Sequence, residues 1–89
     1  MTLEELRNEI DGIDRRLTEL LEARLSAVSQ IATVKADTGK AVRDPERERE
    51  LLAKIADSIK NPDYKEAILA TFDDILRHSR DYQNKKLKG

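Results

Sequence analysis

Two cationic side chains interrupt an otherwise apolar helical face in the first part of the chain. Arg24 stands where the heptad pattern that begins at Leu3 calls for an apolar residue, and Lys35 follows eleven residues later. Eleven steps of about 100° return a helix to within roughly 20° of its starting direction, so both cations share one face. Like charges there are unfavourable unless an anion joins them. The spacing predicts a site for a carboxylate-bearing ligand, although Arg24 alone also fits a snorkelling side chain at a helix interface.

Polar residues also interrupt the apolar stripes of two later segments. Glu48 precedes Leu51 and Ile55 by three and seven residues, which places it on the inward side of a helix. Ser79 and Gln83 continue the apolar stripe of the last segment. We treat all three polar residues as candidate site residues. The alternatives are a solvent-facing Glu48 near a helix N-terminus and an ordinary polar helix end at Ser79 and Gln83.

Arg7 lies too far from Arg24 to share a site with it in one chain. The two residues are seventeen positions apart, which on one helix means about 26 Å along the axis and a rotation of roughly 100°. In an antiparallel dimer, however, the partner's Arg7 would return alongside the second half of the helix. We therefore expect a cationic pocket to which both protomers contribute.

The elements that must position these residues are three helices, and we expect a single all-α domain over residues 1–89. Apolar residues recur at steps of three and four, and strand signals are absent. Gly39 is a helix stop, Asp44 and Asn61 are N-caps, and Pro45 and Pro62 occupy first helical positions. The expected ranges are about 3–37, 45–59 and 62–84 for the helices, with a loop over 38–43.

The first helix is too long for its own chain to cover. Roughly 35 residues of helix rise about 52 Å, whereas a compact chain of 89 residues has a radius of gyration of about 12 Å. The outer half of the apolar seam would therefore face solvent. A homodimer, in which a second copy covers this seam, follows as a prediction.

Composition excludes several classes of function. The chain has 17 Lys and Arg against 18 Asp and Glu, so we expect no nucleic-acid partner. With no Cys and one His, it cannot form a thiolate metal site, a His cluster or a Cys nucleophile. We therefore expect neither a metal nor a cofactor. The sequence contains no apolar run long enough for a bilayer and no secretory signal, so we expect a soluble, cytoplasmic protein without a membrane partner.

Taken together, these positions are similar to those of a known family. They span nearly the whole chain and are Leu6-Arg7, Ile13-Asp14, Arg24, Lys35, the segment 42–49 with the sequence VRDPERER, Ser79 and Gln83. The sequence resembles the all-helical class of chorismate mutases, enzymes of phenylalanine and tyrosine biosynthesis. The resemblance implies an intertwined homodimer of three-helix protomers with two equivalent, shared active sites. The implied substrate is chorismate, and the implied reaction is its Claisen rearrangement to prephenate without covalent catalysis.

The resemblance also implies which side chains bind the two carboxylates of chorismate. Arg7 of one protomer and Arg24 of the other bind them, and Arg47 adds positive charge. Ser79 helps to place one carboxylate. Taken without the resemblance, Arg47 reads as an ordinary surface residue.

The remaining implied roles concern the ether oxygen and the ring hydroxyl. Lys35 and Gln83 donate hydrogen bonds to the ether oxygen, where negative charge develops as the C–O bond breaks. Glu48 and the backbone around Asp44 hold the ring hydroxyl. The expected catalytic residues are therefore Lys35, Gln83, Arg24 and Glu48, and Asp44 is the least specific of the binding residues because its capping role already accounts for it.

Two other functions remain open from the sequence. An isochorismate-pyruvate lyase of the same fold would also need the cations, although Asp44, Arg47 and Glu48 suit the hydroxyl of chorismate better. A non-catalytic helical dimerisation or regulatory module is the rival from a different class, and it would pair Arg24, Lys35 and Glu48 with one another. The resemblance to the chorismate mutases also implies that another shikimate-pathway enzyme could be a partner of the chain or fused to it.

Overall fold

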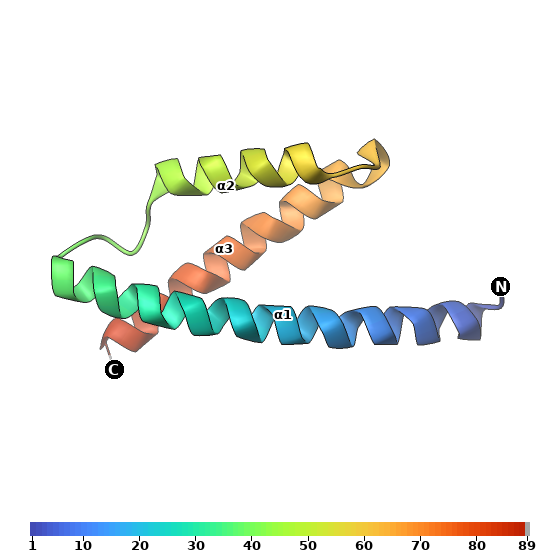
Figure 1. Ribbon diagram of the computed structural model, residues 1–89, viewed down its shortest axis with the longest axis horizontal. Helices are drawn as coiled ribbons and strands as arrows, with labels where there is room; N and C mark the ends of the chain where they lie inside the picture. Colours follow the sequence, from blue (N-terminus) through green and yellow to red (C-terminus); the bar gives the residue numbers. More distant parts are fainter. Residues whose placement is uncertain (89) are drawn as a thin grey trace.

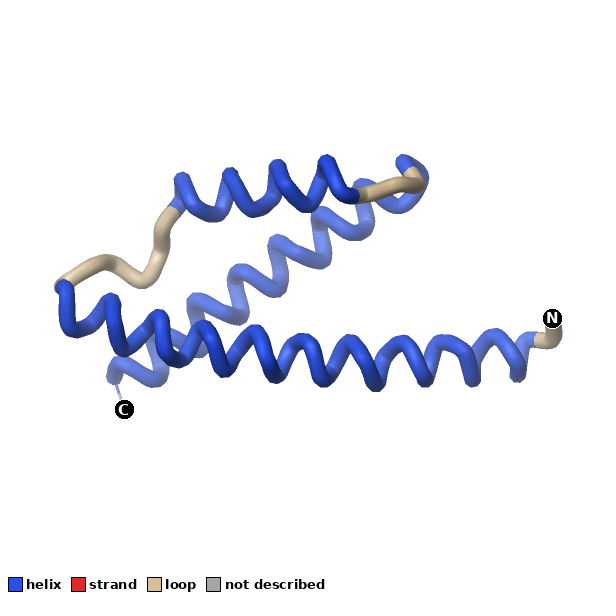
Figure 2. The backbone as a smooth tube through the Cα atoms, viewed as in Figure 1, coloured by secondary structure: helices blue, strands red, loops and turns tan. Residues whose placement is uncertain are grey.

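The structure is a computed structural model, which describes residues 1–88 of the chain. It is built from three α-helices and one short 3-10 helix (Figure 1), and it confirms the all-helical, three-helix fold expected from the sequence. In chain order the elements are α1 (Leu3–Thr38), α2 (Pro45–Ser58), η1 (Pro62–Tyr64) and α3 (Lys65–Lys88). Figure 2 shows that loop segments are confined to the links between these elements and to the N-terminus. Within residues 1–88, no helix combines the length and the apolar character needed to cross a membrane.

Local capping determines both ends of α1. The Thr2 side chain accepts a hydrogen bond from the backbone N–H of Glu5 at 3.1 Å, so one otherwise unpaired donor of the first turn is satisfied. At the other end Gly39 adopts a φ of 72°, a left-handed conformation that glycine reaches without steric cost. The N–H of Lys40 then donates to the Lys35 carbonyl at 2.9 Å, as in a Schellman motif. The chain therefore turns sharply just after Lys35, a predicted site residue.

The ends of the other helices differ slightly from the expected ranges. Asp44 caps α2, as its position before Pro45 predicted, and accepts from the N–H of Arg47 at 3.1 Å. Residues 62–64 form the 3-10 helix η1 rather than the first turn of an α-helix. The segment 85–88, expected to lie outside the last helix, continues α3 to Lys88. Lysine is a good helix former, and its charge is favourable at a helix C-terminus, which explains the extension.

Helix α3 is the element against which both other helices pack. It runs back beneath α2 and crosses the C-terminal half of α1, whereas the N-terminal half of α1 diverges from both helices and its first turns project past their ends (Figure 1). The molecule is consequently open, with a radius of gyration of 16.0 Å and extents of 53 × 27 × 15 Å. The buried apolar residues among those described are only Val28, Ala32 and Leu76.

The projecting half of α1 carries a row of exposed aliphatic side chains. They follow the heptad spacing seen in the sequence and are Leu3, Leu6, Ile10, Ile13, Leu17 and Leu20. Such a row is the apolar seam of a long helix that its own chain leaves uncovered.

Candidate active site

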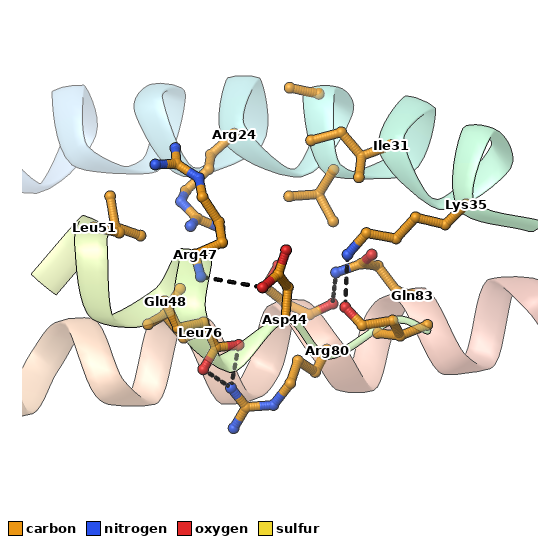
Figure 3. Close-up of a pocket in the computed structure, with 14 residues that line it drawn as sticks. Arg24, Ile31, Lys35, Asp44, Arg47, Glu48, Leu51, Leu76, Arg80 and Gln83 are labelled. Carbon is orange, nitrogen blue, oxygen red and sulfur yellow. Dashed lines mark hydrogen bonds and ion pairs between the residues drawn. The ribbon is translucent and has the colours of Figure 1, made fainter. Parts of the chain in front are cut away.

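A cavity of about 310 Å³ lies where α1, α2 and α3 approach one another. Its volume is within the range of small-molecule sites. Seven of the eight residues predicted from the sequence line it, and they come from all three helices and the loop that precedes α2 (Figure 3). These seven residues are Arg24, Lys35, Asp44, Arg47, Glu48, Ser79 and Gln83. Residues up to 59 positions apart in the sequence thus meet around one cavity.

Three cations of the cavity are not neutralised by carboxylates of the described residues. Arg24 and Lys35 extend from α1, and Arg47 extends toward them from α2 (Figure 3). Among the described residues, none of the three takes part in an ion pair. Arg24 and Lys35 are half-buried, so leaving them without a counter-charge is costly unless an anion binds. The cavity is therefore suited to a ligand with more than one negative group.

Lys35 and Gln83 face each other across one end of the cavity (Figure 3). The Lys35 ammonium donates to the Val42 carbonyl at 2.6 Å, so the side chain is held toward the loop. Gln83 is only 6% exposed, and its Oε1 has no hydrogen-bond partner. Its Nε2 donates to the Ser79 carbonyl at 3.4 Å, which is a long and weak hydrogen bond. A buried amide with an unpaired atom beside a cavity is the expected state of a group that binds a ligand.

The two carboxylates of the cavity have different partners. Asp44 Oδ1 accepts from the Arg47 backbone as the cap of α2. Glu48 accepts from Arg80 on α3, with Nη1 at 2.6 Å from Oε1 and 2.7 Å from Oε2. Glu48 therefore points inward, as its position on the apolar stripe predicted, and it pairs with neither Arg24 nor Lys35.

Arg80 is the charged residue lining the cavity that sequence reasoning missed. It lines the cavity and holds Glu48, yet it was not singled out beside Ser79 and Gln83. A signal was available, because Arg80 follows Leu76 by four residues and therefore lies on the inward face of α3. The same reasoning had identified Arg24 as a charge on an apolar stripe.

Arg7 is the predicted site residue that does not line the cavity. It is exposed on the projecting half of α1, about 26 Å along the helix from Arg24. That Arg7 acts in the site of a second copy stays a prediction.

A comparison with protein families identifies the family of this chain. The family model described as chorismate mutase type II matches residues 6–84 of the chain. The chain belongs to the type II chorismate mutase family. The matched range contains the whole cavity and Arg7, so the family is recognised over the same residues that form the candidate site.

Individual proteins named as chorismate mutases support this assignment. The chorismate mutase of Methanocaldococcus jannaschii is 30% identical over 87 residues, covering 97% of this chain and 88% of that protein. The bifunctional chorismate mutase/prephenate dehydratase of Buchnera aphidicola is 37% identical over 83 residues, or 92% of this chain. A chorismate mutase structure from Thermus thermophilus superimposes with a TM-score of 0.86 at 30% identity, covering 92% of this chain and 93% of that one.

The relatives differ greatly in length. The chain spans 22% of the Buchnera protein and 13% of another longer relative, whereas it spans most of the Methanocaldococcus enzyme. The mutase domain thus occurs both nearly alone and as a small part of larger proteins.

Proposed function

We propose that this chain is a chorismate mutase, an isomerase that converts chorismate to prephenate in phenylalanine and tyrosine biosynthesis. The observation that carries the proposal is the coincidence of the family match with the cavity that gathers seven of the predicted site residues. The substrate is a dianion, and the cavity offers cations without ion-pair partners. At one end it also offers two hydrogen-bond donors, Lys35 and Gln83. The reaction is an intramolecular rearrangement, for which neither a covalent intermediate nor a metal is required.

The first task of such an enzyme is to hold the flexible substrate in its reactive conformation. Arg24 and the Arg7 of the other copy bind the two carboxylates, Arg47 adds positive charge, and Ser79 hydrogen-bonds one carboxylate. The enolpyruvyl side chain of chorismate is thereby folded over the ring, so that the two carbons that form the new bond face each other. Fixing a reactive conformer in this way supplies a large part of the rate enhancement in intramolecular reactions.

The second task is to stabilise the negative charge that develops on the ether oxygen. Lys35 and Gln83 converge on this atom from α1 and α3. An ammonium has three donors, so Lys35 can keep its contact with the Val42 carbonyl and still donate to the substrate. Gln83 gives up only a 3.4 Å contact with Ser79 when its Nε2 turns toward the ether oxygen. Such preorganised donors are the largest single source of catalysis in many enzymes.

The ring hydroxyl of chorismate is held at the start of α2. Glu48 accepts a hydrogen bond from it, and the backbone around Asp44 completes the contact. These two groups favour a ring with a hydroxyl at this position, which is how chorismate is selected over isochorismate.

The functional unit is a homodimer in which each site takes Arg7 from the other copy. Two features support this. The core of one protomer contains no fully buried large side chain among the described residues, and the apolar seam of α1 is exposed over its projecting half. A second copy would cover the seam and bring its Arg7 to the unpaired cations of the cavity. The length of α1 supports this shared site.

Sedimentation measures the oligomeric state. At micromolar concentration we expect a single species with the mass of two 10.2 kDa chains, because burying the α1 seam removes a large apolar area from water. The same sample should be predominantly helical by circular dichroism. A folded monomer at this concentration would contradict the dimer and with it the role of Arg7.

The direct test of function is the loss of chorismate absorbance with purified protein. Prephenate is identified by its acid conversion to phenylpyruvate, and an equal amount of protein is incubated with isochorismate as the control substrate. We expect rapid loss of chorismate and formation of prephenate. Release of pyruvate and salicylate from isochorismate instead would indicate a lyase, and a folded dimer inactive on both substrates would indicate a non-catalytic helical module.

A further shikimate-pathway enzyme is proposed as a partner, either fused to this domain or bound to it. The Buchnera relative, which carries both a mutase and a prephenate dehydratase name, supports the idea. Prephenate is a reactive intermediate, so an enzyme that consumes it would benefit from proximity.

A further inference from the structure

We propose that Arg80 is a positioning residue for the mutase reaction, which holds the Glu48 carboxylate in place for the ring hydroxyl of the substrate and neutralises its charge. The inference rests on the proposed function, because the hydroxyl is that of chorismate. Arg80 does not touch the reacting atoms, so it acts through Glu48. The evidence lies in the geometry of the pair, its burial and the charges around the cavity.

The geometry fixes the orientation of the carboxylate. A single nitrogen of Arg80, Nη1, donates to both oxygens of Glu48 at 2.6 and 2.7 Å. A donor on the bisector of a carboxylate prevents its rotation, because turning the group would lengthen one of the two bonds. The contact also joins α2 to α3 across 32 residues of sequence. Figure 3 shows the Arg80 guanidinium on the side of Glu48 that faces α3.

The pair leaves Glu48 able to accept more hydrogen bonds. An ionised carboxylate has about four lone-pair positions, of which Arg80 occupies one on each oxygen. The remaining positions are available to a hydroxyl that enters the cavity. Arg80 therefore orients the Glu48 carboxylate and leaves it able to accept a hydrogen bond from the substrate.

Burial distinguishes this pair from an ordinary surface ion pair. The side chains of Arg80 and Glu48 are 23% and 19% exposed. Among the described residues α3 has one other ion pair, Arg77 with Asp74 at 3.2 Å, whose side chains are 59% and 64% exposed. An exposed pair of that kind contributes little, whereas a partly desolvated charge-assisted contact is stronger and better oriented.

Charge gives the second reason for Arg80. One chain lines the cavity with four cations and two carboxylates, so the cavity is positively charged, as suits a dianionic substrate, even before the other copy adds its Arg7. Without Arg80 the Glu48 carboxylate would stand uncompensated next to a ligand of the same sign, and like charges at close range oppose binding. Arg80 thus allows an acceptor for the hydroxyl to coexist with a site for two carboxylates.

A double-mutant cycle tests the proposal, with kcat and KM for chorismate measured for Arg80→Met, Glu48→Gln and the double variant. We expect Arg80→Met to lower kcat/KM about ten- to one-hundredfold, as small misplacements of positioning groups do. In the Glu48→Gln background the same change should cost less than about twofold, because the carboxylate that Arg80 positions is gone. Arg80→Lys should recover most of the activity, since one nitrogen makes the contact. Arg77→Met, the matched control on α3, should retain wild-type kcat/KM.

Three results would overturn the positioning role of Arg80. These are wild-type kcat/KM in Arg80→Met, an equal loss in the wild-type and Glu48→Gln backgrounds, and an Arg80→Lys variant as impaired as Arg80→Met. An equal loss would mean that Arg80 serves only to tie α3 to α2. Thermal unfolding and sedimentation are recorded for each variant, and if Arg80→Met does not fold, Arg80→Gln takes its place in the same cycle. A wild-type protein that leaves chorismate unchanged would instead overturn the proposed function itself.

Discussion

Replacing Lys35 by alanine should lower kcat for chorismate by about 10²- to 10³-fold, the range measured when one donor to a developing oxyanion is removed. Lys35 and Gln83 are the two proposed donors to the ether oxygen, and of these only Lys35 is charged. Gln83 therefore cannot replace the charge that Lys35 supplies. The effect falls on kcat because the charge on the ether oxygen develops only in the transition state. Steady-state kinetics on the purified variant provide the measurement.

This experiment must distinguish two effects of Lys35→Ala, the loss of a hydrogen-bond donor to the substrate and the loosening of the loop before α2. The Lys35 ammonium also donates to the Val42 carbonyl, so the variant loses a contact that holds the segment before α2. Loss of that contact alone would raise KM and lower the unfolding temperature, whereas loss of the donor lowers kcat. Lys54→Ala, an exposed lysine on α2, is the matched control and should behave as wild type. Normal kcat in a folded, dimeric Lys35→Ala protein would refute the assigned role.

Two inactive variants should restore activity when their chains are combined. Arg7→Ala removes one cation from each site, and we expect a loss of the same order as for Lys35→Ala. In a mixed dimer, the site built on the Arg7→Ala chain has its own intact Lys35 and receives intact Arg7 from the Lys35→Ala chain. The second site carries both defects. With random pairing, about one quarter of all sites should be intact, so activity should return to about a quarter of wild type.

The same mixing experiment has an internal control. Arg24 and Lys35 belong to one α1 and contribute to the same site, so combining Arg24→Ala with Lys35→Ala leaves one defect in each site of the mixed dimer. No recovery is expected there. The chains are unfolded and refolded together so that they exchange, and the content of mixed dimers is measured by mass. Absence of recovery with Arg7→Ala, despite confirmed mixed dimers, would show that the sites are not shared.

Much of the fold was predictable because helices are determined largely by local patterns. The steps of three and four that begin at Leu3, the cap at Asp44 and the stop at Gly39 are all short-range signals, and the structure follows them. The misjudged details were also local. Pro62 opens a 3-10 helix rather than an α-helix, and the lysines at the C-terminus extend α3.

The candidate site was predictable where polar residues broke an apolar stripe. Arg24, Lys35, Glu48, Ser79 and Gln83 were identified in this way, and all five line the cavity. Arg47 and Asp44 have ordinary roles when read from the sequence, and they became candidates through the family resemblance. Both also line the cavity.

The sequence by itself determined which residues face inward on each helix, because that direction depends on periodicity and caps within a few positions of the chain. Only the tertiary structure decided which of these residues meet. Arg80 reaches Glu48 across 32 residues, and Lys35 reaches the Val42 carbonyl around the turn at Gly39. Both contacts depend on how α3 lies against its neighbours and on the path of the loop, and no periodicity within one helix encodes the position of another.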